Sequence, residues 1–281
     1  MYAKDQDVTK LVAPYRRMYL HISPDRNGAA VYFTQTLDLT KTRAWLERQR
    51  EQTGKHLTLL HVYLAAAGRL LHANPNLNRY VAGYRMYQRD GVHLTISVKK
   101  AMTADAKVVL LKVPMEPDDD PIRVHDRVVA MVDKGRSEKT TAEKEYDLFL
   151  MVPGFLVNLF ARFAMWLQRR RWLPGALVDP DGMFCSLFVA NLGSVGLDAA
   201  YHHLYEWGNC PFFATIGRVQ DRVVPTDEGT EVRKIVEVKY AFDERVEDGL
   251  TCAIALEGLQ KLIEDPDQFL GAATPKLVSA A

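Results

Sequence analysis

The chain has 281 residues, of which 48% are hydrophobic and 25% charged, and this composition is typical of a globular protein with one substantial core. Its 36 basic and 35 acidic side chains leave a formal charge of +1, which excludes the strong positive field that gathers nucleic acid. The three cysteines stand far apart without C-x-x-C spacing, which argues against a disulfide framework and a zinc site. We therefore expect one domain over residues 1–281, located in the cytoplasm, with no nucleic-acid partner and no metal.

The first half of the chain predicts alternating strands and helices. The N-terminal residues are charged and contain no apolar run, so we expect no secretory signal and a mature chain that starts at residue 1. Asp38 or Thr40 can cap a helix that runs through Trp45. Apolar residues at steps of three and four predict a buried helix over residues 57–71, before an Asn-Pro-Asn turn signal. The other elements expected here are strands at 30–37, 92–98 and 108–113 and a helix at 121–132.

An apolar segment follows at residues 148–167, and the basic and aromatic sequence Gln168-Arg169-Arg170-Arg171-Trp172 comes directly after it. A transmembrane helix needs about 20 apolar residues with few polar breaks, and this segment is interrupted by Pro153, Gly154, Asn158 and Arg162. We expect one or two helices that do not span a membrane. Either residues 148–172 cover a core or a subunit contact, which we favour, or they lie at a membrane surface and make the protein peripheral to it.

The last third of the chain again predicts strands followed by a helix. Strict alternation at Val236, Val238, Tyr240 and Phe242 is typical of a half-buried strand. Further strands are expected at 183–190 and 212–219, and a helix at 250–263. The whole pattern indicates a sheet with helices packed against it.

The strand that ends at Phe242 runs directly into the sequence Asp243-Glu244-Arg245-Val246-Glu247-Asp248-Gly249, before the last helix. This arrangement resembles the D-H-R-x-x-D-G signature of the catalytic domain of 2-oxoacid dehydrogenase acyltransferases, relatives of chloramphenicol acetyltransferase. Asp243, Arg245, Asp248 and Gly249 match the signature, and Glu244 stands in place of the histidine. The resemblance covers almost the whole chain, because four other parts occur in the family's order: residues 57–71 with 74–78, residues 92–98, the glycine-rich element 190–196 and residues 216–219.

The resemblance implies a fold and an assembly. The fold would be an α/β (α+β) two-layer sandwich, with helices on a mixed β-sheet. The single domain would carry an apolar insertion at about residues 142–178, and no lipoyl or subunit-binding domain. The family assembles as a homotrimer with active-site channels between subunits, so we expect a homotrimer, with a larger cage as an open alternative. Coenzyme A or acyl-coenzyme A would be a substrate, and no cofactor would be tightly bound.

The resemblance also assigns roles to residues. The family's histidine acts as general base on a thiol, which then attacks a thioester. An ordinary glutamate has a pKa of about 4.3 and a thiol about 8.5, so full proton transfer to a glutamate is uphill by roughly 5–6 kcal/mol. The hydroxyl that stabilises the family's tetrahedral intermediate aligns with Ala190, although Ser194 lies nearby. Two parts of the machinery are thus missing, which predicts a catalytically degenerate scaffold or a ligand-binding pseudoenzyme.

The remaining members of the site follow from the same alignment. Asn191 and Gly193 would line the substrate together with Ala190 and Ser194, whereas Asp243, Arg245 and Gly249 would be structural. Asp248 is a candidate for either role. The acidic run at 243–248 could attract a hard cation, but the arginine in its middle favours ion pairing.

An alternative is an active coenzyme A-dependent acyltransferase with a non-standard base. That base would be Glu244, or one of the two histidines His202 and His203 in the connection Asp198 to Gly208, which approaches the channel in the family. Packing is the competing interpretation for both histidines, because neighbouring residues point in different directions and are not expected to face one site together. The third hypothesis is a membrane-associated assembly protein that acts through residues 148–172.

Overall fold

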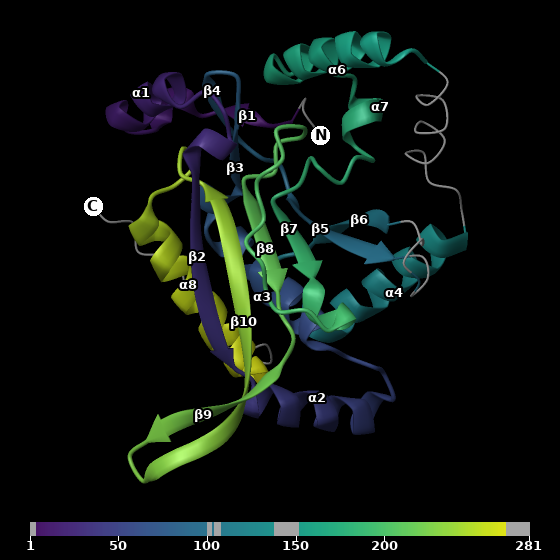
Figure 1. Cartoon of the computed structure of the whole chain (residues 1–281), viewed down its shortest axis with the longest axis vertical. Helices are drawn as coiled ribbons and strands as arrows, with labels where there is room; N and C mark the ends of the chain where they lie inside the picture. Colours follow the sequence, from purple (N-terminus) through teal and green to yellow (C-terminus); the bar gives the residue numbers. More distant parts are fainter. Residues whose placement is uncertain (1–3, 100–102, 104–107, 138–151, 268–281) are drawn as a thin grey trace.

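Seven strands of the described chain form a mixed sheet at the centre of the fold (Figure 1). The structure is a computed structural model that describes residues 4–99, 103, 108–137 and 152–267. The strand order is β2-β10-β8-β7-β5-β6, with β9 paired to the outer part of β10. Only the pairs β5–β7 and β7–β8 are parallel. The strands are β2 (Ala30–Asp38), β5 (Val92–Lys99), β6 (Val108–Met115), β7 (Leu187–Asn191), β8 (Phe212–Ile216), β9 (Gln220–Thr226) and β10 (Gly229–Asp243).

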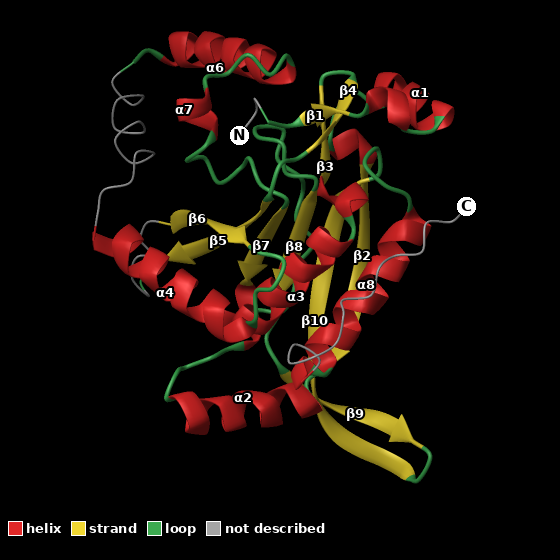
Figure 2. Cartoon of the chain, turned by 180° about the vertical axis from the view of Figure 1, so that it is seen from behind, coloured by secondary structure: helices red, strands yellow, loops and turns green. Residues whose placement is uncertain are grey.

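Three helices cover one face of this sheet, as the view from behind shows (Figure 2). They are α3 (Leu59–Ala73), α4 (Pro121–Ser137) and α8 (Gly249–Glu264), while α2 (Thr40–Thr53) lies at one end. Alternate residues of β10, including Val236 and Val238, join the main core between the sheet and the helices. Helix α3 lies so close to β6 that a Cβ at Gly68 would be 2.8 Å from the Met115 side chain. The predicted two-layer arrangement of a mixed sheet and packed helices is confirmed.

The opposite end of the molecule from the β9–β10 hairpin carries a small second sheet and two surface helices (Figure 1). The small sheet has the order β1-β4-β3, from β1 (Gln6–Asp7), β4 (Arg85–Gln88) and β3 (Arg79–Ala82). The helices at this end are α1 (Pro14–Ile22) and α6 (Gly154–Arg169), followed by the short α7 (Gly175–Val178). Among the described residues, no helix is long and apolar enough to cross a membrane.

Most predicted elements are present, with differences at their ends. The helix through Trp45 begins at Thr40 after an N-cap at Leu39, and Asp38 instead accepts hydrogen bonds from the Thr40 amide and hydroxyl. The strand expected from Met183 begins only at Leu187, and the strand expected to reach residue 219 ends at Ile216. The first strand is shorter because residues 181–186 form turns that return the chain to the sheet. Residues 142–151 of the predicted insertion lie outside the described residues.

Candidate functional site

The turn between β10 and α8 is held by a buried ion pair. Arg245 donates from Nε and Nη2 to the two oxygens of Asp243, at 2.8 and 2.7 Å, and both side chains are almost fully buried. Arg245 Nη1 donates to the carbonyls of Ser23 and Pro24 at 3.0 Å, and Arg26 Nε lies 3.9 Å from Asp243. Burial alone would lower the pKa of Arg245, but the hydrogen bonds and charge of Asp243 outweigh it and raise this pKa. Two arginines therefore share one carboxylate under the turn.

Asp248 has a structural position at the start of α8. It is the N-cap residue, and its Oδ1 accepts a hydrogen bond from the Thr251 amide at 2.9 Å, which is the main cause of the lowered pKa of Asp248. Arg16 of α1 lies 3.2 Å from Glu247 and 3.3 Å from Asp248. Two carboxylates of the acidic run at 243–248 are therefore engaged in ion pairs with Arg16. The described residues contain no group of three or more His, Cys, Asp or Glu side chains that could hold a metal. A Cβ added at Gly249 would meet open space, so local packing does not require glycine there.

Glu244 is half-buried and has its own partners. Its amide donates to the Ala29 carbonyl at 3.0 Å, and its carboxylate accepts a hydrogen bond from the Tyr19 hydroxyl, also at 3.0 Å. Burial is the largest cause that raises the pKa of Tyr19, and the hydrogen bond to Glu244 adds to it. The phenol therefore stays protonated at neutral pH and remains a donor. Glu244 thus serves as a hydrogen-bond acceptor for α1.

The glycine-rich element begins on the other face of the sheet from the helices. Ala190 lies at the end of β7, opposite Thr215 of β8. A Cβ at Gly193 would be 2.4 Å from the Gly217 carbonyl oxygen, so this close approach of two backbones requires glycine. Exposed Ser194 donates its hydroxyl to the Asn191 carbonyl at 2.7 Å. Ala190 supplies no hydroxyl, and the Ser194 hydroxyl already has a backbone acceptor.

The register of the strands separates Ala190 from Glu244 within one chain. Ala190 pairs with Thr215, and Thr215 pairs with Lys239 of β10. Asp243, the last residue of β10, is four residues beyond Lys239, a distance of roughly 13 Å along the strand direction, and Glu244 follows it in the turn. Ala190 and Glu244 are therefore far apart within one chain.

The connection from Asp198 to Gly208 lies against the face that carries Ala190. The His202 ring stacks on Phe213 with centroids 4.0 Å apart and planes 4° apart. Phe213 is two residues from Thr215, so His202 lies about 7 Å along the strand from the level of Ala190. The ring of His203 stacks on that of His202 at 4.6 Å. The two rings therefore lie side by side, because the connection has no regular strand or helix geometry that would alternate their side chains.

The two histidines differ in their surroundings. His202 Nδ1 lies 2.7 Å from the His203 carbonyl oxygen, so Nδ1 carries the proton and Nε2 is left as an acceptor. Burial lowers the pKa of His202, which keeps this ring neutral at neutral pH. His203 is exposed, with Nδ1 3.1 Å from the Leu204 carbonyl oxygen. His202 therefore has the tautomer of a general base.

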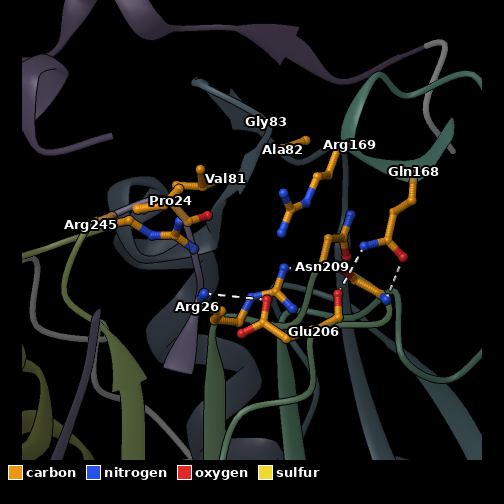
Figure 3. A pocket seen from close by; sticks show the side chains of 11 residues that line it. Pro24, Arg26, Val81, Ala82, Gly83, Gln168, Arg169, Glu206, Asn209 and Arg245 are labelled. Carbon is orange, nitrogen blue, oxygen red and sulfur yellow. Dashed lines mark hydrogen bonds between the residues drawn. The ribbon is translucent and has the colours of Figure 1, made fainter. Parts of the chain in front are cut away.

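A small polar pocket of about 30 Å³ lies beside Arg245 (Figure 3). Sequence reasoning missed its lining, because the residues come from five distant segments and form no motif; they include Arg26, Gln168, Arg169, Glu206 and Asn209. Gln168 binds the connection from Asp198 to Gly208 at two points. Its Nε2 donates to the Glu206 carbonyl at 2.9 Å, and its Oε1 accepts a hydrogen bond from the Gly208 amide at 2.7 Å. The pocket has room for water but not for coenzyme A.

Comparison with known proteins gives matches in family and in fold. Residues 181–271 match the family model described as 2-oxoacid dehydrogenases acyltransferase (catalytic domain). Among curated proteins, no sequence matches this chain. Similar solved structures include the cubic core of the pyruvate dehydrogenase multienzyme complex, which is 17% identical with a TM-score of 0.62 over 90% of this chain and 88% of that one.

Two further structures support the same fold. The dihydrolipoamide acetyltransferase of Azotobacter vinelandii is 19% identical, with a TM-score of 0.61 over 90% of this chain and 88% of that one. A chloramphenicol acetyltransferase is 12% identical, with a TM-score of 0.56 over 95% of this chain and all of that one (100%). The chain has the fold of these acyltransferases, and its C-terminal part matches the family of their catalytic domains. The predicted resemblance and fold class are confirmed.

Proposed function

We propose that this chain is a catalytically degenerate acyltransferase that retains the fold and assembly of its family as a scaffold or as a binder of an acyl or pantetheine-like ligand. The observation that carries this proposal is Glu244. The turn around it is fully built, with Asp243 and Arg245 in a buried ion pair and Asp248 capping α8. In this proposal Glu244 stands where the family has its general base, and its carboxylate accepts a hydrogen bond from Tyr19.

The oxyanion position supports the same conclusion. Removing one oxyanion donor typically slows an enzyme by about 100- to 1,000-fold. Ala190 has no donor, and the hydroxyl of its neighbour Thr215 is donated to the Ala200 carbonyl. Acyl transfer to a thiol thus lacks both the base and the hydroxyl at their family positions. The direct test is acetyl transfer from acetyl-coenzyme A to dihydrolipoamide, for which we expect no more than the uncatalysed rate.

A homotrimer is part of the proposal. Ala190 and Glu244 are too far apart to share a site in one chain, so a complete channel needs a second copy, which fits the channel between subunits that the resemblance implies. Helix α1, which holds Glu244 through Tyr19, also presents an exposed apolar stripe to solvent, formed by Tyr15, Met18 and Ile22, which are 60%, 61% and 66% exposed. An apolar stripe of this kind beside the site favours a subunit contact. A cage built from such trimers stays a further possibility to be distinguished by mass.

Light scattering should therefore give at least three times the monomer mass of 31.8 kDa. Met18→Asp should shift the protein toward the monomer, because it places a charge in the proposed apolar contact. Val223→Asp is the matched control, since Val223 is 68% exposed on the β9–β10 hairpin at the other end of the molecule. A wild-type protein that is monodisperse at 31.8 kDa would rule out the trimer.

The cysteines support a cytoplasmic location within this proposal. All three are free and buried, namely Cys185, Cys210 and Cys252. Free thiols are usual in proteins of a reducing compartment.

A second candidate function rests on His202. Its Nε2 is the acceptor of a neutral imidazole, on the same sheet face as Ala190. An active acyltransferase could use it as a relocated base, either within one subunit or toward the channel of a neighbour. Under this alternative, acetyl transfer would be robust in the wild type and would not depend on Glu244.

The two candidates make opposite predictions for His202→Phe, which keeps a ring stacked on Phe213 but removes the base. The alternative predicts a loss of about 100- to 10,000-fold in kcat, with Glu244→Gln at the wild-type rate. His203→Phe is the control, because His203 is exposed and lies next to the same ring. Equal background rates for all four proteins would eliminate the alternative.

A further inference from the structure

Helix α6 presents its most apolar side to solvent. Phe155, Leu159, Phe163 and Trp166 follow one another at steps of four, four and three residues and form one stripe along the helix. They are 72%, 64%, 54% and 42% exposed. The buried residues of α6 are Ala164 and Gln168, which lie on the opposite side of the helix. The helix therefore packs onto the protein through Ala164, Gln168 and the half-buried Leu167, and directs the four residues of the stripe away from it.

Cationic side chains border this stripe. Exposed Arg162 and Arg170 stand four residues before and four residues after Trp166, so both lie beside the tryptophan end of the stripe. Arg170 lies over the Trp166 ring at 4.0 Å and near the Trp172 ring at 5.8 Å, and Trp172 is 62% exposed. Residues 152–172 contain no Asp or Glu. The surface thus combines apolar, aromatic and basic groups without any acidic group.

The charge distinguishes this stripe from the one on α1. On α1, Arg16 lies over the exposed Tyr15 ring at 5.5 Å, but it is buried and paired with Glu247, so it adds no solvent-facing charge to Tyr15, Met18 and Ile22. A purely apolar stripe suits another protein subunit, whereas a stripe bordered by arginines and tryptophans suits an anionic lipid surface. Helix α6 also lies at the outermost edge of the molecule, at the end opposite the β9–β10 hairpin, in both views (Figures 1 and 2).

We propose that α6 docks the protein on the surface of a bilayer that contains anionic phospholipid. The 16 residues of α6 are too few to span a bilayer, which needs about 20. The helix instead lies in the plane of the interface, with Phe155, Leu159 and Phe163 among the acyl chains. Trp166 and Trp172 lie at the headgroup level, and Arg162 and Arg170 contact lipid phosphates. This inference does not depend on whether the acyltransferase site is active.

The test is flotation of the full chain with two kinds of vesicle, pure phosphatidylcholine and phosphatidylcholine mixed with phosphatidylglycerol. The wild type should float with the anionic vesicles, and added salt should weaken binding because it screens the arginines. Leu159→Ser with Phe163→Ser should bind roughly 10- to 100-fold more weakly, since two large apolar side chains no longer enter the bilayer. Arg162→Gln with Arg170→Gln should reduce the preference for anionic vesicles by roughly fivefold for each arginine.

Two controls separate this proposal from its alternatives. Val223→Ser with Val232→Ser removes two apolar residues that are 68% and 69% exposed on the distant hairpin, and should bind vesicles as the wild type does. Phe163→Leu keeps the apolar character and should retain most of the binding. The proposal is overturned if the wild-type protein does not float with anionic vesicles, or if the Leu159→Ser/Phe163→Ser variant binds them as strongly as the wild type. A fall in oligomeric mass in that variant with unchanged vesicle binding also overturns it, because the stripe would then be a subunit contact.

Discussion

Replacing Glu244 with histidine and Ala190 with serine should turn a background rate into measurable acetyl transfer from acetyl-coenzyme A to dihydrolipoamide. The turn that positions residue 244 is intact, because Asp243, Arg245 and Asp248 keep their buried or capping partners. A general base contributes about 100- to 10,000-fold and an oxyanion donor about 100- to 1,000-fold. We expect the double variant to show most of the gain, and Glu244→His alone to show a smaller one.

A matched control is Glu257→His, which makes the same substitution on the exposed surface of α8. It should stay at the background rate. The proposal of a degenerate site would be contradicted by wild-type activity that survives Glu244→Gln. A double variant that stays at background would show that Glu244 and Ala190 are not the only missing parts, and that the channel itself no longer admits the substrates.

The order of elements could be predicted from the sequence because local patterns determine it. Alternation over residues 236–242 and helical spacing over 57–71 both lie in regular elements of the main core. The first part of β10 was missed for a physical reason. Residues 229–235 pair with β9 in a hairpin whose faces are mostly exposed, so their charged and apolar residues follow no core pattern. Helix α1 was missed because its apolar stripe faces solvent and its buried face carries Arg16.

The contacts that surround Glu244 could not be read from the sequence. Tyr19 and Arg16 lie more than 220 positions from their partners in the turn, with separations of 225 and 231 residues. The signature predicted which residues form the turn but not which helix holds it. The distance between Ala190 and Glu244 could not be predicted from the sequence either, since it depends on the register of three neighbouring strands, β7, β8 and β10. The stacking of His202 on Phe213 likewise depends on how an irregular connection lies on the sheet.

Asp243→Asn should be among the most destabilising single substitutions in this chain. Asp243 is fully buried and receives three hydrogen bonds from Arg245, one from its amide and two from its guanidinium, while Arg26 Nε lies 3.9 Å away. Burial lowers the pKa of Arg26, and the charges of Asp243 and Glu206 oppose this effect, so the two carboxylates compensate a buried positive charge. Neutralising the shared carboxylate leaves two buried arginines without it. Removing one partner of a buried pair typically costs about 3–5 kcal/mol.

Thermal unfolding measures this effect, and a loss of that size should lower the Tm by roughly 6–20 °C. Asp198→Asn is the control, because Asp198 is also paired with an arginine, Arg218 at 2.8 Å, but both side chains are more than half exposed. It should leave the Tm nearly unchanged, since water screens that pair. An equal Tm for both variants would mean that the pairs of Arg16 with Glu247 and Asp248 hold the turn without Asp243.

The same substitution also tests why the turn is retained in a chain that lacks the base. Arg245 ties the turn to the carbonyls of Ser23 and Pro24, and Glu244 ties it to α1 through Tyr19. If the turn serves mainly to join α1 to the sheet, Asp243→Asn should weaken the trimer as well as the fold, because α1 carries the proposed contact stripe. Mass measured well below the Tm of the variant separates the two effects. A stable trimer in Asp243→Asn, with only its Tm lowered, would show that the turn supports the core of each subunit and not the assembly.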